Sequence, residues 1–270
     1  MRYALLAGVG AAALGFASPS MAAGGNVILT GHDDDFHCDG FLGAGHGAGI
    51  SPCAQLGAMT AFARNGSSLP VLAIDNGTEL TASLTALGIP FTKVSVAGVT
   101  AGMFNHSTYS AFVVASSTDC GGCDNPATTG STLATFASSI DSFFNSGGGI
   151  VGLTSAGDAN GFAYVPQAAG ATAIGHSSGF AATPAGLGIA GFDAVNGDET
   201  HNIFSSLAGY TVAEVDTTVS PNAPVTIFVQ NGTITGTRIS GGGGVPEPMS
   251  LSLLGAGLFG LGVARWRRRR

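Results

Sequence analysis

Basic side chains are scarce between residues 24 and 244, where only Arg64, Lys93 and Arg238 face fifteen aspartates and glutamates. Charged residues of both signs make up 9% of the whole chain, whereas glycine alone contributes 44 residues. Proteins hold nucleic acids and anionic lipid surfaces through clustered lysine and arginine, so this composition argues against both partners. Acidic, lysine-poor domains of secreted proteins often bind calcium, and acidity that serves only solubility explains the same composition.

Long apolar runs without charge occur at the two ends of the chain. At the N-terminus, Met1 and Arg2 precede an apolar core at residues 4–16. Residues 20–22 (Ser-Met-Ala) then satisfy the small-x-small rule of signal peptidase, with cleavage after residue 22 or 23. The alternative is a buried N-terminal helix of the domain. We expect residues 1–23 to be a signal peptide and the chain to be exported.

The C-terminal end carries a motif, a short apolar run and a basic cluster, in that order. Pro246, Glu247 and Pro248 precede the apolar residues 249–264, and five arginines follow within residues 265–270. Sixteen residues are just under the ~17–25 of a membrane-spanning helix. The arginines would hold that end on the cytoplasmic side. Four glycines at 241–244 form a flexible linker to this tail.

Residues 245–270 resemble the PEP-CTERM sorting tail of Gram-negative bacteria. The resemblance implies that an exosortase recognises the Pro-Glu-Pro motif and processes the tail, after signal peptidase has removed the N-terminal segment. It also implies an inner-membrane anchor through residues 249–264 until processing. The protein would then reach the cell surface or an extracellular matrix of exopolysaccharide.

Four cysteines, all between these two ends, suit an oxidising compartment. Four cysteines allow three pairings, and sequence neighbours close loops at the lowest entropic cost, which favours Cys38–Cys53 and Cys120–Cys123. The second pair forms a CxxC motif, for which a metal site and redox chemistry are the alternatives. A redox cysteine usually begins a helix. Residues 124–126 (Asp-Asn-Pro) instead indicate a loop, which favours a structural disulfide.

Residues 24–240 are long enough for one domain with a substantial core. Apolar runs of strand length alternate with segments of helical spacing, and these runs are apolar on both faces. This pattern predicts an open α/β fold with a mostly parallel sheet flanked by helices. We expect strands at residues 26–30, 71–74, 91–96, 109–115 and 150–153, and helices at 52–64, 79–87 and 131–145.

The pattern weakens after residue 160, because glycine, alanine and serine dominate up to residue 191. Strand-like runs return near the C-terminal end of the domain. Asn231 and Gly232 separate the last two runs, which predicts a C-terminal β-hairpin. The three runs are residues 210–215, 224–230 and 233–239.

The densest polar cluster follows the first expected strand, at the sheet edge where ligands gather in open α/β folds. Residues 32–39 contain two histidines and four aspartates. They suit acid–base catalysis by His32, Asp34 and His37, joined by His201 from later in the chain. The alternative is a solvated loop, held by a disulfide, whose aspartates cap backbone amides.

The same cluster also suits a divalent metal. Imidazole with carboxylate is typical of zinc, manganese or iron, whereas carboxylates by themselves suit calcium. Candidate ligands within the cluster are His32, Asp33, Asp35 and His37. Further ligands would come from His46, Asp75 or His201.

The strand at 150–153 runs into a turn of small residues that includes Thr154 and Ser155. Here the chain resembles the class I glutamine amidotransferase-like superfamily, within it the trehalose-utilisation (ThuA-like) branch. The resemblance spans most of residues 26–216 and implies a flavodoxin-like core. Its motifs are residues 28–32 with His37, the helix end at 144–149, this strand and turn, and residues 200–204, where Asn202 replaces a proline.

Amidotransferases of this superfamily carry a cysteine at the tip of that turn, where this chain has Thr154 and Ser155. Glutamine hydrolysis by a thiol is therefore not supported. Ser155 as a nucleophile would need His176 or His201 as its base, and a turn that requires small residues explains the sequence equally well. Outside these roles, His106 and His176 are expected to be surface residues. His201 could reach the same sheet edge and face the His32–His37 segment, and the alternative is that residues 198 and 200 cap a helix beginning near Asn202.

Two functions follow as expectations. The first is an exported, surface- or matrix-directed protein whose non-catalytic amidotransferase-like domain binds a carbohydrate or an ion. The second is a carbohydrate-active hydrolase or isomerase that uses His32, Asp34, His37 and His201, with or without a divalent metal such as calcium or zinc.

Overall fold

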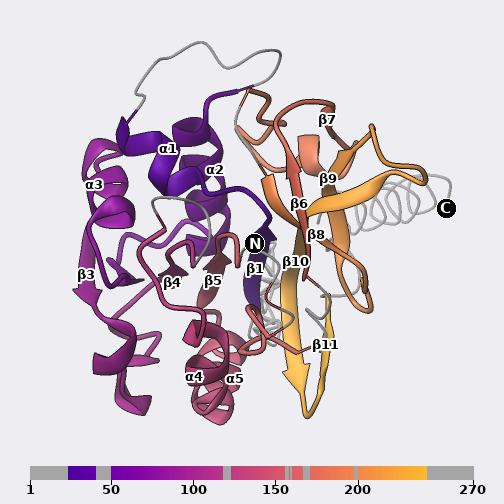
Figure 1. Cartoon of the computed structure of the whole chain (residues 1–270). Coiled ribbons are helices and arrows are strands. Elements are labelled where there is room, and N and C mark those ends of the chain that lie inside the picture. The colour runs from indigo at the N-terminus through magenta and orange to yellow at the C-terminus, as the bar shows by residue number, and fades with distance from the viewer. Residues whose placement is uncertain are drawn as a thin grey trace, which may run out of the picture.

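The computed structural model in Figure 1 describes residues 24–40, 50–117, 123–155, 158, 160–166, 171–197 and 200–241. Within these ranges no helix is long and apolar enough to cross a bilayer. Several predictions lie outside the described residues. They are the signal peptide, His46, Cys120, most of the glycine linker, the motif at Pro246, Glu247 and Pro248, and the apolar segment at residues 249–264.

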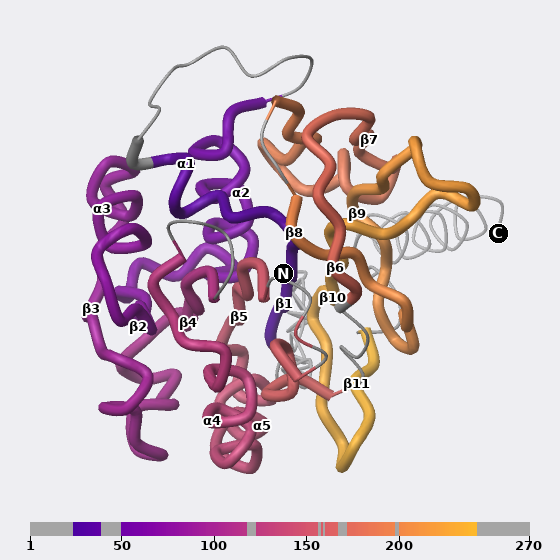
Figure 2. Tube along the Cα trace, in the orientation of Figure 1, coloured from indigo at the N-terminus to yellow at the C-terminus, as the bar shows by residue number. Residues whose placement is uncertain are grey.

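A mixed sheet forms the centre of the described structure, with nine strands in the order β3-β2-β4-β5-β1-β10-β9-β7 and β11 paired to β10. Neighbours from β3 to β1 are parallel, and those from β1 onward are antiparallel. Figure 2 shows the N-terminal strand β1 between these two halves. The strands are β1 (Gly25–Thr30), β2 (Val71–Ile74), β3 (Phe91–Val94), β4 (Ala111–Val114), β5 (Gly149–Gly152), β7 (Phe180–Ala182), β9 (Thr211–Asp216), β10 (Ala223–Thr235) and β11 (Arg238–Ser240).

Helices cover both faces of the parallel half, and a small second sheet pairs β6 with β8. Because successive strand residues point to opposite faces, β1 serves two cores. Val27 and Leu29 pack in the core that contains residues of α5, whereas Ile28 packs in the core that contains residues of α2. The remaining elements are α1 (Asp34–Gly40), α2 (Pro52–Arg64), α3 (Glu79–Ala86), α4 (Thr129–Ala134), α5 (Ala137–Asn145), β6 (Ala171–His176) and β8 (Thr200–Phe204).

This architecture confirms the predicted open α/β fold with its mostly parallel sheet and flanking helices. Helix α2 shows why the local signals sufficed. Ser51 precedes the helix and its hydroxyl accepts a hydrogen bond from Ala54 N at 3.2 Å, and Pro52 occupies the first helical position. Asn65 ends the helix in a left-handed conformation with φ of 48°.

One predicted helix is divided in two. Residues 131–145 form the end of α4 and all of α5, with a break at Thr135 and Phe136. The Thr135 hydroxyl donates to the carbonyl of Thr132, and the Phe136 N–H donates to the carbonyl of Leu133. Threonine side chains that bond to nearby backbone compete with regular helix. The apolar spacing was correct, because Leu133 and the apolar positions of α5 still reach one core.

The C-terminal hairpin is confirmed, but its turn lies five residues beyond the predicted one. β10 runs through Asn231, whose N–H donates to Asn26 Oδ1 at 2.7 Å, and Gly232 pairs with Gly25 of β1. Tertiary pairing with β1 thus turns the Asn-Gly signal into a local irregularity. The turn comes instead at Gly236, which has φ of 61° and joins β10 to β11.

At two other segments the structure excludes an alternative that the sequence had left open. The residues after β1 form helix α1 and not a solvated loop, and Asp33, Asp34 and Asp35 are each only 1% exposed. Carboxylates in a first helical turn are stabilised by the N–H groups that point toward them. Residues 200–204 form strand β8 where a helix start was the alternative, because they pair with β6.

A disulfide joins the end of α1 to the start of α2. Cys38 and Cys53 are bonded with a Cα–Cα distance of 4.5 Å, as predicted. Cys123 is also disulfide-bonded. Its predicted partner, Cys120, lies outside the described residues.

Candidate functional site

The segments that follow β1, β4 and β5 meet at the carboxyl edge of the parallel strands, and β8 joins them. The Thr154 N–H donates to the carbonyl of His32 at 3.1 Å, and the His201 N–H donates to the carbonyl of Gly31 at 2.8 Å. Ser116, which follows β4, donates its N–H to Asp35 Oδ2 at 2.8 Å. Hydrogen bonds donated by backbone N–H groups therefore hold these four segments together around the predicted site residues.

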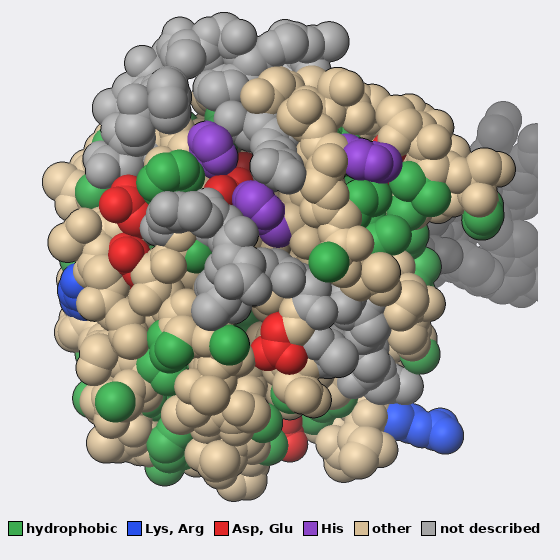
Figure 3. All heavy atoms as spheres, viewed as in Figure 1, with side chains coloured by type: hydrophobic (Ala, Val, Ile, Leu, Met, Phe, Trp, Pro, Cys, Tyr) green, Lys and Arg blue, Asp and Glu red, His purple; other side chains and the backbone are tan. Residues whose placement is uncertain are grey.

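Asp33, His37 and His201 form a cluster, named here the Asp33 cluster, around one buried carboxylate. Asp33 Oδ2 lies 3.3 Å from His37 Nε2 and 3.2 Å from His201 Nε2. Both separations are within the range of an ion pair, which forms when the imidazole is protonated. The imidazoles are 20% and 14% exposed, so they present an edge to solvent. In the upper part of Figure 3, histidine side chains (purple) lie next to acidic ones (red) on the surface.

Opposing effects set the protonation of Asp33. Burial raises the pKa of this carboxyl, but the neighbouring His201 and His37 outweigh burial and hold the pKa below its ordinary value. Asp33 is thus a carboxylate near neutral pH, and it orients both rings.

Two other predicted residues point to different partners. His32 Nε2 lies 3.3 Å from Glu214 Oε2, and both side chains are buried. Both oxygens of Asp35 contact Ser116, which donates its N–H to one and pairs its hydroxyl with the other. Burial raises the pKa of Asp35 to about 7. Asp34 is buried in the first turn of α1.

Glu214 was not foreseen from the sequence. Its carboxylate accepts hydrogen bonds from Gln55 Nε2 at 3.2 Å, Thr226 Oγ1 at 2.8 Å and Val195 N at 3.1 Å, besides contacting His32. The available signal was an acidic residue between the apolar residues Ala213 and Val215 of a strand, since such a residue is rarely buried without partners.

The four residues predicted as metal ligands do not converge. Asp33 pairs with His37, whereas His32 pairs with Glu214 and Asp35 with Ser116. No group of three or more histidine, cysteine, aspartate or glutamate side chains in the described ranges is arranged to hold a metal ion. The further candidate Asp75 accepts backbone N–H groups of Gly77 and Thr81 at the start of α3.

The small-residue turn after β5 is organised by Asn202. Asn202 Oδ1 accepts hydrogen bonds from Thr154 Oγ1 at 2.6 Å and from Ser155 N at 3.1 Å. Ser155 Oγ contacts the carbonyl of Asp158 at 3.4 Å. Both predicted bases for a serine nucleophile pair with an aspartate, His201 with Asp33 and His176 with Asp216, as such a base requires. The hydrogen bonds from Thr154 and Ser155 to Asn202 and Asp158 favour a structural turn at these two residues.

His176 is more than the isolated surface residue expected. Its Nδ1 lies 2.5 Å from Asp216 Oδ2, and its side chain is 40% exposed while Asp216 is buried. The Thr218 hydroxyl donates to Asp216 Oδ1 at 2.6 Å. Burial raises the pKa of Asp216, but Thr218 and His176 outweigh it and hold that pKa below its ordinary value.

None of the protein-family models, curated proteins or solved structures compared with the chain matches it.

Replacing Asp33 by asparagine tests the charge assigned to this residue. A carboxyl with a lowered pKa stabilises the fold above its unfolded pKa, and this stability is lost as pH falls below about 3.8. We expect Asp33→Asn to lower the free energy of unfolding by about 1–3 kcal/mol at pH 7. The difference from the wild type should shrink toward pH 3 in urea titrations. An equal loss at both pH values would contradict the charged role.

Proposed function

We propose that this is an exported protein, directed to the cell surface or matrix, whose α/β domain binds carbohydrate at the Asp33 cluster. The observation that carries the proposal is the single buried carboxylate shared by two partly exposed imidazoles at the carboxyl edge of the parallel strands. In open α/β sheets this edge is where ligands bind.

The chemistry of the cluster supports a polyhydroxylated ligand. Asp33 fixes both rings, so that His201 can exchange hydrogen bonds with hydroxyl groups and His37, whose Nδ1 is buried, adds a partly exposed ring beside it. Phe36, which is half-buried, lies edge-on to His37 with ring centroids 5.1 Å apart. An aromatic surface beside oriented polar groups suits a sugar, which has both a C–H face and hydroxyl edges.

The address is proposed from the ends of the sequence. Residues 1–23 suit a signal peptide and residues 245–270 resemble a PEP-CTERM tail, which implies signal peptidase, an exosortase and an inner-membrane anchor before release. The bonded Cys38 and Cys53 support an oxidising compartment. Exopolysaccharide would then be the ligand at hand.

The amidotransferase-like assignment remains part of the proposal, and it carries no amidotransferase activity. The turn that holds a cysteine in those enzymes holds Thr154 and Ser155 here, and both are bonded to Asn202. A binding role is therefore proposed for the domain.

The second candidate is a carbohydrate-active hydrolase, favoured by one observation. Asp33 holds two imidazoles at once, which is the orientation that acid–base catalysis requires. One imidazole would take a proton from water as its oxygen attacks the anomeric carbon. The other would protonate the departing glycosidic oxygen.

Binding to exopolysaccharide from the producing organism tests both candidates. The full-length protein should co-elute with the polymer in size-exclusion chromatography without changing its length. His37→Ala, which removes one of the two rings that Asp33 orients, should weaken binding roughly tenfold. His106→Gln, a histidine between β3 and β4 at the opposite edge, is the matched control and should bind normally.

Two results would revise the proposal. Polymer shortening that disappears in His37→Ala would establish the hydrolase. Equal binding by the wild type and His37→Ala would remove the Asp33 cluster from carbohydrate recognition.

A further inference from the structure

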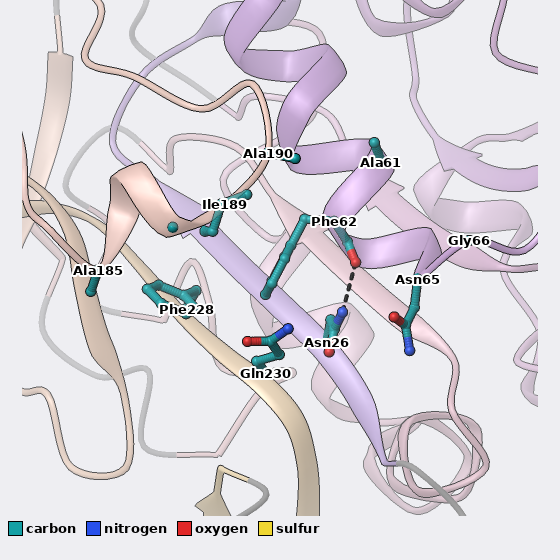
Figure 4. Close-up of a pocket in the computed structure, with 11 residues that line it drawn as sticks. Asn26, Ala61, Phe62, Asn65, Gly66, Ala185, Ile189, Ala190, Phe228 and Gln230 are labelled. Carbon is teal, nitrogen blue, oxygen red and sulfur yellow. Dashed lines mark hydrogen bonds between the residues drawn. The ribbon is translucent and has the colours of Figure 1, made fainter. Parts of the chain in front are cut away.

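A hollow of about 410 Å³ lies on the α2 face of the sheet, away from the Asp33 cluster. Asn26, near the start of β1, lines the hollow. His32, which precedes Asp33 of the cluster, lies six residues further along the chain, a span of about 20 Å when extended. Its volume falls within the range of sites for small ligands. Figure 4 shows the lining, which comes from the C-terminal part of α2 and the two residues after it, the start of β1, the middle of β10, and the loop around Ile189.

Small residues leave this space open, and two aromatic rings form part of its wall. Ala61, Ala185 and Gly188 contribute little volume to the lining. Phe62 of α2 and Phe228 of β10 meet edge to face with ring centroids 5.6 Å apart. The wall therefore offers an apolar surface to a ligand.

One amide of the lining is structural. Asn26 Nδ2 donates to the carbonyl of Phe62 at 2.7 Å, and its Oδ1 accepts from Asn231 N at 2.7 Å. Asn26 thus ties the end of α2 to β10 and holds the wall in shape. Within the described ranges, no hydrogen bond engages the exposed side-chain amides of Asn65 and Gln230, which remain for a ligand.

The electrostatics select against charged ligands. None of the residues that line the hollow is ionisable. A buried phosphate, carboxylate or ammonium would lose hydration without gaining an opposite charge, which is costly. The ligand is therefore neutral, with polar groups at its edge for the amides and an apolar face for the rings.

We infer that this hollow is a second binding site, and that it takes a neutral sugar of mono- or disaccharide size. Leu187, which is 58% exposed, lies in sequence between the lining residues Ala185 and Gly188. This site is independent of the Asp33 cluster, so either can fail without the other.

The test is titration calorimetry of the full-length protein with maltose, cellobiose and lactose, and with glucuronate as the anionic probe. At least one disaccharide should bind, and glucuronate should bind more weakly. Ala61→Leu, which fills the hollow with a good helix former, should weaken binding about tenfold or more. Ala54→Leu, an exposed alanine of the same helix outside the lining, is the matched control.

Gln230→Ala keeps the test decisive if Ala61→Leu fails to fold, and it should weaken disaccharide binding while leaving the thermal midpoint near that of the wild type. His37→Ala should leave disaccharide binding in the hollow unchanged. Three results would overturn the inference: no disaccharide binding, binding that survives both hollow variants, or displacement of the sugar by glucuronate at equal affinity.

Discussion

Asp35→Asn is expected to remove most of the fall in stability that the wild type shows between pH 4 and pH 7. Burial raises the pKa of Asp35 from 3.8 to about 7 in the folded protein. The folded state therefore binds this proton more tightly than the unfolded chain. The contribution of Asp35 to the free energy of unfolding is fully present below pH 3.8 and is lost as pH rises toward 7. At about 1.4 kcal/mol per pKa unit, the loss is of the order of 4 kcal/mol.

Asparagine reproduces the protonated acid at this position. Its carbonyl can accept the Ser116 N–H that Asp35 accepts, and its amide can donate to the Ser116 hydroxyl. Urea unfolding at pH 4, 5.5, 7 and 8 should show a flatter profile for the variant. Asp193→Asn, at a half-buried aspartate, is the control for the loss of one carboxylate. A variant less stable than the wild type at pH 8 would contradict the assignment.

Removing the Cys38–Cys53 disulfide is expected to cost about 3 kcal/mol. The bond closes a loop with a sequence separation of 15, for which chain entropy in the unfolded state predicts that magnitude. The Cys38→Ser and Cys53→Ser double variant should show the loss in guanidinium unfolding under non-reducing conditions. Cys120→Ser with Cys123→Ser is the matched control, because the loop predicted for this pair is much shorter and its loss should cost less.

The Cys38→Ser and Cys53→Ser double variant also tests how this disulfide supports the site. α1 carries His37 and ends at the disulfide, so freeing its C-terminal end should loosen the Asp33 cluster. Polymer binding should weaken even where the protein remains folded. Full stability and full binding in the double serine variant would show that the bond is dispensable for both.

Much of the fold was predictable because its signals are local. The cap at Ser51 and the proline at position 52 define the start of α2, and Asn65 follows its last residue. Its bounds, residues 52 to 64, are those predicted. The strands β2 and β5 are apolar on both faces, which by itself indicates a covered parallel sheet. The Cys38–Cys53 pair followed from sequence proximity. His37 was predicted as a site residue from the polar cluster after the first strand and His201 from the polar segment around it, and the structure brings both to Asp33.

Tertiary structure decided the rest, because the deciding contacts are distant in sequence. The Asn231-Gly232 turn signal yields to pairing of β10 with β1, and the hairpin forms at Gly236. Likewise, the partners of His32 and His176 lie on β9. The sequence by itself determined which residues are apolar, capping or ionisable. Only the folded chain determined which carboxylate each histidine meets, since burial excludes water and makes those pairings obligatory.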